Sequence, residues 1–70
     1  MGCSLKDAMT LHRLYREYVG SGVPNAKRLL NVVQRETLAV KRGTVHAPPK
    51  LARKLNATAR AVAKLAARCR

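Results

Sequence analysis

The side chains that could catalyse a reaction or bind a metal are few and widely spaced in this 70-residue sequence. They are Cys3, Asp7, His12, Glu17, Glu36, His46 and Cys69. Two cysteines without a Cys-x-x-Cys pair do not make a structural zinc site. The three acids are too scattered to form the paired carboxylates of general acid–base catalysis. We therefore expect no enzyme activity, no metal, no cofactor and no small-molecule substrate.

The two cysteines stand near opposite ends of the chain. Because disulfides are rare in reducing compartments, we expect Cys3 and Cys69 to be free thiols. The opening Met1-Gly2-Cys3 also has the Gly and Cys of an acylated anchor. Lys6 stands where the myristoylation motif needs Ser or Thr, so we expect no acylation.

The dominant chemical feature is a surplus of basic side chains. Fifteen Lys and Arg against three acids give a formal charge of +12, and no acid follows Glu36. Solvated helix faces usually mix charges of both signs, whereas an unbalanced face repels itself. The planar fork of Arg matches phosphate oxygens. The surplus therefore predicts a nucleic-acid partner, and the lack of Trp and Phe argues against a membrane surface.

Helical periodicity and two breaks organise the chain that must position these charges. The breaks are 20–24 and 43–49, where glycine and proline interrupt a helix. Ser4 and Asn25 are suited to cap the helices that follow them. The pattern predicts an all-α fold with helices at about 4–19, 25–42 and 49–69. We expect a single small basic domain over 1–70, extended rather than compactly globular.

Each predicted helix has an apolar face and a cationic face. In the last helix Leu55, Val62 and Leu65 share the apolar face, by the 3.6-residue period. The basic residues on the other sides of the last two helices are the predicted phosphate contacts. They are Arg28, Arg35, Arg42, Arg53, Lys54, Arg60, Lys64 and Arg68.

Residues 51–68 also have the spacing of a helix-turn-helix motif. Asn56 would stand at the turn, and Thr58 would begin a recognition helix. One unbroken helix explains the same positions, because 57–61 contain no helix breaker, and we favour it. The alternative function is a dimeric DNA-binding regulator in a bacterial or phage-infected cytoplasm.

The stretch Leu11-His12-Arg13-Leu14-Tyr15-Arg16, followed by Gly22-Val23 and Arg28, resembles the opening of the twenty-first protein of the bacterial small ribosomal subunit. The resemblance covers residues 11–28. It implies a turn at Gly22 and rRNA contacts by Arg13, Arg16 and Arg28. It further implies ribosomal RNA and neighbouring ribosomal proteins as partners.

These observations favour a structural RNA-binding protein of a ribonucleoprotein, most of all a small ribosomal subunit. The family has organellar relatives, so the resemblance implies a ribosomal subunit of the mitochondrion. A further alternative is a helical subunit of an organellar complex, which would associate through the apolar faces.

Overall fold

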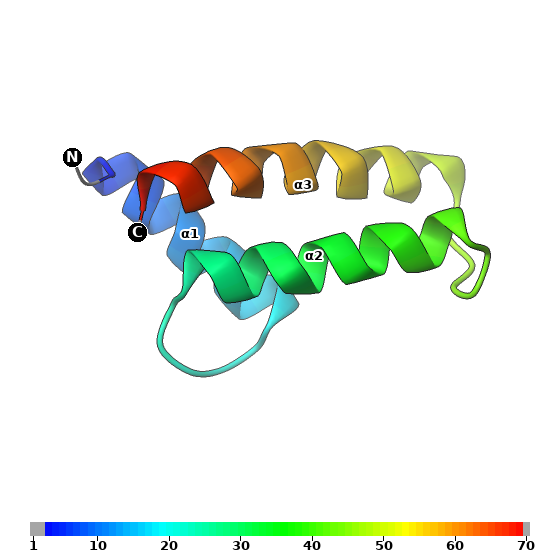
Figure 1. Cartoon of the computed structure of the whole chain (residues 1–70), viewed down its shortest axis with the longest axis horizontal. Helices are drawn as coiled ribbons and strands as arrows, with labels where there is room; N and C mark the ends of the chain where they lie inside the picture. The colour runs from blue at the N-terminus through cyan, green and yellow to red at the C-terminus, as the bar shows by residue number, and fades with distance from the viewer. Residues whose placement is uncertain (1–2, 70) are drawn as a thin grey trace.

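Three helices make up the computed structural model, which describes residues 3–69 (Figure 1). They are α1 (Leu5–Tyr18), α2 (Ala26–Lys41) and α3 (Pro49–Arg68). The predicted all-α class is confirmed, and each observed boundary lies within one residue of its prediction. The prediction that Gly2 is not acylated lies outside the described residues.

Side-chain caps begin the first two helices, as the sequence predicts. The Ser4 hydroxyl accepts a hydrogen bond from the backbone N–H of Asp7 at 3.1 Å. The Asn25 side chain accepts from the backbone N–H groups of Lys27 and Arg28 at 3.0 and 3.3 Å. These bonds satisfy donors that the first helical turn leaves without an intrahelical partner.

The end of α2 is a Schellman motif that turns the chain toward α3. The N–H of Gly43 donates to the carbonyl of Val40 at 3.1 Å, and that of Thr44 donates to Ala39 at 3.0 Å. Gly43 has a φ of +77°, a conformation in which a Cβ would be strained. The two bonds satisfy carbonyls in the last turn of α2 and fix the start of the connection.

The helices α2 and α3 pack side by side as an antiparallel hairpin, and α1 lies against one end of it (Figure 1). That end carries both termini of the described chain. Its core is made of aliphatic residues and one tyrosine from all three helices. The core residues are Leu11, Leu14, Tyr15, Ala26, Leu29, Val33, Val62 and Leu65.

The outline of the molecule is elongated, with extents of 38 × 21 × 15 Å. Its radius of gyration is 12.3 Å, close to the roughly 11 Å of a globular chain of this length. The helices therefore pack together, and the expected extension is limited to the long axis of the hairpin.

The helix α3 runs without a break through Asn56 and Thr58. The favoured prediction of one unbroken helix is confirmed. The alternative helix-turn-helix interpretation, which required a turn there, was wrong. Alanine-rich sequence around Thr58 supports continuous helix, and the apolar face that includes Val62 packs along α2 as one stripe.

The prediction of two free thiols was also wrong. Cys3 and Cys69 form a disulfide, and their Cα atoms lie 4.9 Å apart. The packing of α1 against the end of α3 brings these two residues together although 66 positions separate them. Beside the disulfide, Arg68 Nη1 lies 3.4 Å from Asp7 Oδ2 in an exposed ion pair.

Candidate nucleic-acid interface

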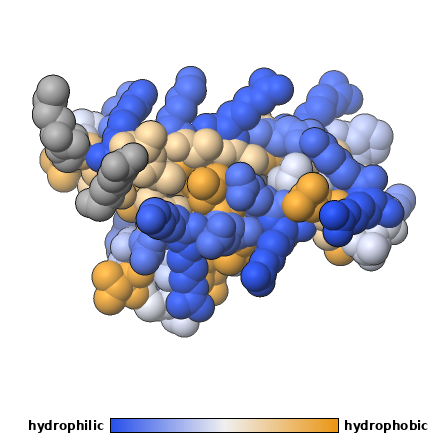
Figure 2. Space-filling view, viewed as in Figure 1, coloured by the Kyte–Doolittle hydropathy of each residue, from blue (hydrophilic) through white to orange (hydrophobic). Residues whose placement is uncertain are grey.

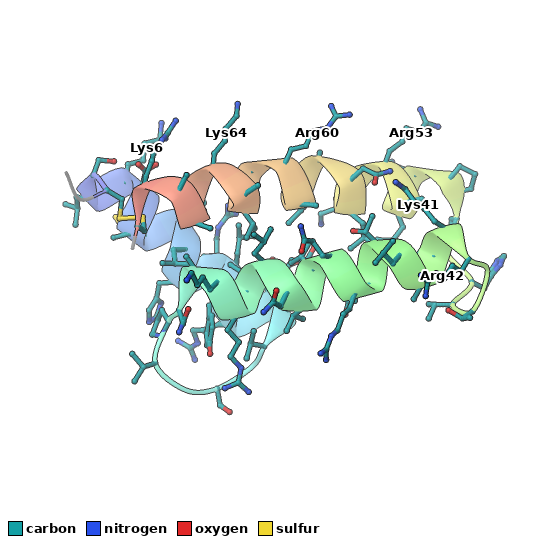
Figure 3. All side chains as sticks on the ribbon, viewed as in Figure 1. Lys6, Lys41, Arg42, Arg53, Arg60 and Lys64 are labelled. Carbon is teal, nitrogen blue, oxygen red and sulfur yellow. A yellow bond between two sulfur atoms is a disulfide. The ribbon has the colours of Figure 1, made fainter. Side chains whose placement is uncertain are left out.

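One row of cations follows the outer side of α3. Arg53, Arg60 and Lys64 project away from α2 along the length of the helix (Figure 3). All three are exposed, and helical geometry places them opposite the buried Leu55 and Val62. With a rise of about 1.5 Å per residue, the row extends for roughly 16 Å. We call these three residues the α3 cationic face.

The row continues onto α1 at the end of the molecule that carries the Cys3–Cys69 disulfide. Lys6 of α1 points in the same direction as Lys64, just beyond the end of the α3 row. Figure 2 shows the resulting line of hydrophilic side chains projecting from this edge. Sequence reasoning missed Lys6 as a site residue, because only tertiary packing aligns α1 with α3.

A second row of cations follows the outer side of α2. Arg28, Arg35 and Arg42 are all exposed and recur every seven residues, opposite the fully buried Val33. Arg42 lies at the end of the hairpin where α2 turns toward α3 (Figure 3). We call the three arginines the α2 cationic face.

The remaining predicted contacts lie outside these two faces. Arg13 and Arg16 are exposed on α1, where they line a shallow hollow with His12. Lys54 is exposed beside Leu51 on α3. Arg68 is exposed and paired with an acid. The structure thus brings the predicted residues together as two rows and separate smaller groups, not as one patch.

The hairpin separates the two cationic faces. Because α2 and α3 bury their apolar faces against each other, the opposite face of each helix points outward. The α3 cationic face therefore points to one side of the molecule and the α2 cationic face to the other. Two polyanions, or two segments of one, could contact these faces at the same time.

Few protein groups neutralise this charge. Every Lys and Arg within residues 3–69 is exposed, and Arg68–Asp7 is the single ion pair in that part of the chain. Exposed guanidinium and ammonium groups remain free to contact phosphate oxygens. At the same time, their mutual repulsion opposes packing of the helices.

The described residues offer neither a metal site nor a membrane span. No three His, Cys, Asp or Glu side chains gather where they could share a metal ion. None of the described helices combines the length and the apolar character needed to cross a bilayer. Comparisons of the chain with models of known protein families, with curated proteins and with solved structures found no match.

Proposed function

We propose that this chain is a structural RNA-binding component of a ribonucleoprotein. The observation that carries the proposal is the pair of outward cationic faces on one small hairpin. Phosphate contacts by Lys and Arg release counterions, and this release supplies most of the affinity in sequence-independent binding. A rigid body with cations on two sides holds together RNA segments that would otherwise repel each other.

RNA is preferred to a sequence-specific DNA site for a structural reason. A recognition helix of a helix-turn-helix protein needs a turn before it, and α3 has none. Arg60 and Lys64 instead belong to a continuous row suited to a phosphate backbone. The chain also has few aromatic rings for base stacking, and Tyr15 is buried. Contact with phosphates is what the exposed surface supports best.

The finer proposal is a place in a small ribosomal subunit, in particular that of the mitochondrion, in contact with ribosomal RNA and neighbouring ribosomal proteins. It rests on the family resemblance of residues 11–28. Two structural details agree with it. Leu11, Leu14 and Tyr15 of that stretch are buried, which leaves Arg13 and Arg16 exposed.

The second detail concerns the turn that follows. Gly22 has a φ of +104° in the connection between α1 and α2, and a Cβ there would lie 3.7 Å from the Tyr15 hydroxyl. The resemblance implies a turn at this glycine, and the backbone bends at this position.

The disulfide bears on the compartment in which such a particle would assemble. Reducing compartments keep thiols reduced, whereas oxidising compartments preserve disulfides. In a reducing compartment, which the ribosomal proposal implies, Cys3 and Cys69 would be free thiols. The ends of α1 and α3 would then be held by the Arg68–Asp7 pair and by packing alone. Bound RNA would then stabilise the fold by neutralising the charge of +12.

Sedimentation of the tagged full chain from lysate, with and without ribonuclease, tests the proposal. We expect the chain to migrate with a ribosomal subunit and to leave that fraction after digestion. Migration that ribonuclease does not change would contradict RNA binding. Migration with a ribonuclease-sensitive particle that lacks ribosomal RNA would retain RNA binding and exclude the ribosomal assignment.

A further inference from the structure

The end of the hairpin farthest from the termini has an apolar hollow that no part of α1 covers. It has a volume of about 410 Å³ and lies between α2, the α2–α3 connection and α3. Its apolar lining residues are Ala39, Val40, Val45, Ala47, Leu51 and Leu55. We call it the loop-end groove.

The short first helix explains why the groove is open. The three-helix core draws on Leu29 and Val33 from the first half of α2 and on Val62 and Leu65 from the second half of α3. Beyond these residues the hairpin has two layers only. Leu55 is buried there, but neighbouring apolar side chains have no third element to pack against.

The exposure of two residues shows how incomplete this packing is. Leu51 is 46% exposed and Val45 is 52% exposed, and both line the groove. Single exposed apolar residues are common on protein surfaces. Two such residues in one concave and mostly apolar site are instead typical of a binding surface.

The charges around the groove are almost all positive. Arg35, Glu36 and His46 line it, and Lys50 and Lys54 line an adjoining hollow that shares Leu51. Lys41, Arg42 and Arg53 lie at the same end of the molecule (Figure 3). Glu36 is therefore the single acid among the residues that line these two hollows.

We propose that the loop-end groove binds an acidic amphipathic helix of a partner protein. The partner's apolar side chains would contact Leu51 and Val45, and its Asp or Glu side chains would face Arg35 and Lys54. This charge complementarity excludes a second copy of the chain, because the copy would bring cations against cations. The proposal does not rest on RNA binding, since the groove has apolar walls that phosphate does not match. Arg35 belongs both to the groove and to the α2 cationic face, so an acidic helix and RNA would compete for this side chain.

A membrane surface fits the groove less well than a helix does. Amphipathic segments that bind bilayers present projecting Trp, Phe or Leu side chains. Here the apolar residues line a hollow between two helices, and the sequence has no Trp and no Phe. An inserted helix matches this concave shape.

Fluorescence anisotropy with three labelled peptides and the full chain tests the proposal. The probes are a helical peptide with one Leu face and one Glu face, a scrambled peptide of the same composition, and a Leu/Lys amphipathic peptide. Anionic vesicles and a structured RNA are measured in parallel. We expect the Leu/Glu peptide to bind at least tenfold more tightly than the scrambled peptide, and the Leu/Lys peptide to bind least.

Variants at uncharged residues leave the net charge of the chain unchanged. They therefore distinguish apolar contact in the groove from general electrostatic attraction between the peptide and the basic surface. Leu51→Ala and Val45→Ala should each weaken binding of the Leu/Glu peptide by about three- to tenfold. The reason is that peptide binding would bury the exposed half of each wild-type side chain. Val23→Ala changes a residue that is 85% exposed in the other connection, and it should have no effect. RNA affinity should be the same in all three variants.

Two results would overturn the proposal. The scrambled peptide could bind as tightly as the Leu/Glu peptide, with no effect of Leu51→Ala or Val45→Ala, which would show general attraction to the basic surface. Alternatively, the two variants could weaken binding to vesicles and leave peptide binding unchanged, which would assign the groove to a lipid surface. Circular dichroism of each variant shows that it is folded.

Discussion

The Cα atoms of Cys3 and Cys69 lie 4.9 Å apart, and their disulfide joins the residue two positions before α1 to the residue that follows α3. The bond closes a loop that contains nearly the whole chain. Arg68 and Asp7 form an ion pair beside it, but exposed pairs of this kind contribute little. The disulfide is thus the strongest link between α1 and the end of the hairpin.

Reduction of this disulfide should destabilise the fold strongly. The sequence separation of 66 between the cysteines corresponds to about 4 kcal/mol of loop-closure entropy in the unfolded chain. The small core supplies only about 3–5 kcal/mol in a domain of this size. We expect urea denaturation followed by circular dichroism to show a much lower midpoint with reductant present.

The Cys3→Ser/Cys69→Ser double variant is the control for reduction. It should have the low midpoint of the reduced chain and should not respond to reductant. Equal midpoints for the oxidised and reduced chains would contradict the disulfide's contribution to stability. Mass spectrometry after alkylation without reductant would establish the pairing itself, because two free thiols would both be labelled.

Truncation of Leu29 should lower the free energy of unfolding more than truncation of any exposed residue does. Leu29 is fully buried between the helices, and Leu→Ala changes in cores cost about 2–5 kcal/mol. Leu38→Ala is the matched control on the same helix, because Leu38 is 48% exposed; it should cost less than about 1 kcal/mol. Urea midpoints of the oxidised variants compare the two, and equal losses would exclude the core described above.

The cap of α2 should contribute measurably to stability. Asn25→Ala removes the acceptor for the N–H groups of Lys27 and Arg28, and losing such a cap costs about 1 kcal/mol. Asn31→Ala, at an exposed position inside α2, should be neutral or slightly stabilising because Ala is the better helix former. Thermal denaturation of both variants tests this, and a neutral Asn25→Ala would contradict the cap.

Removal of the α3 cationic face should lower the salt dependence of RNA binding. Each phosphate contact contributes nearly one unit to the slope of log K against log salt. The Arg53→Gln/Arg60→Gln/Lys64→Gln variant should therefore lose about two to three units of slope. Filter binding over a salt series measures it, and an unchanged slope would show that these cations do not contact phosphates.

Simultaneous binding of two RNA segments by one protein is a separate prediction, because it needs both cationic faces at once. Wild-type protein on an immobilised RNA should retain a second, labelled RNA. The triple variant of the α3 face, or the matching Arg28→Gln/Arg35→Gln/Arg42→Gln variant of the α2 face, should still bind the first RNA but retain much less of the second. Equal retention by all three proteins would leave RNA binding intact and exclude bridging.

Local features of the sequence were sufficient to predict the secondary structure. Ser4 and Asn25 cap helices because a cap depends on hydrogen bonds within three residues. The α2 cationic face follows from the seven-residue spacing of its arginines, since helical periodicity alone decides which residues share a face. The unbroken α3 was likewise predicted from the absence of a breaker between Asn56 and Val62.

Features that join distant residues required the tertiary structure. Nothing near Cys3 in the sequence indicates that it pairs with Cys69, and the rarity of disulfides in reducing compartments pointed the other way. Lys6 joins the α3 row, and the groove at Leu51 stays open, because a short α1 packs against only one end of the hairpin. Periodicity assigns a face to each helix, whereas the lengths and packing of all three decide what each face meets.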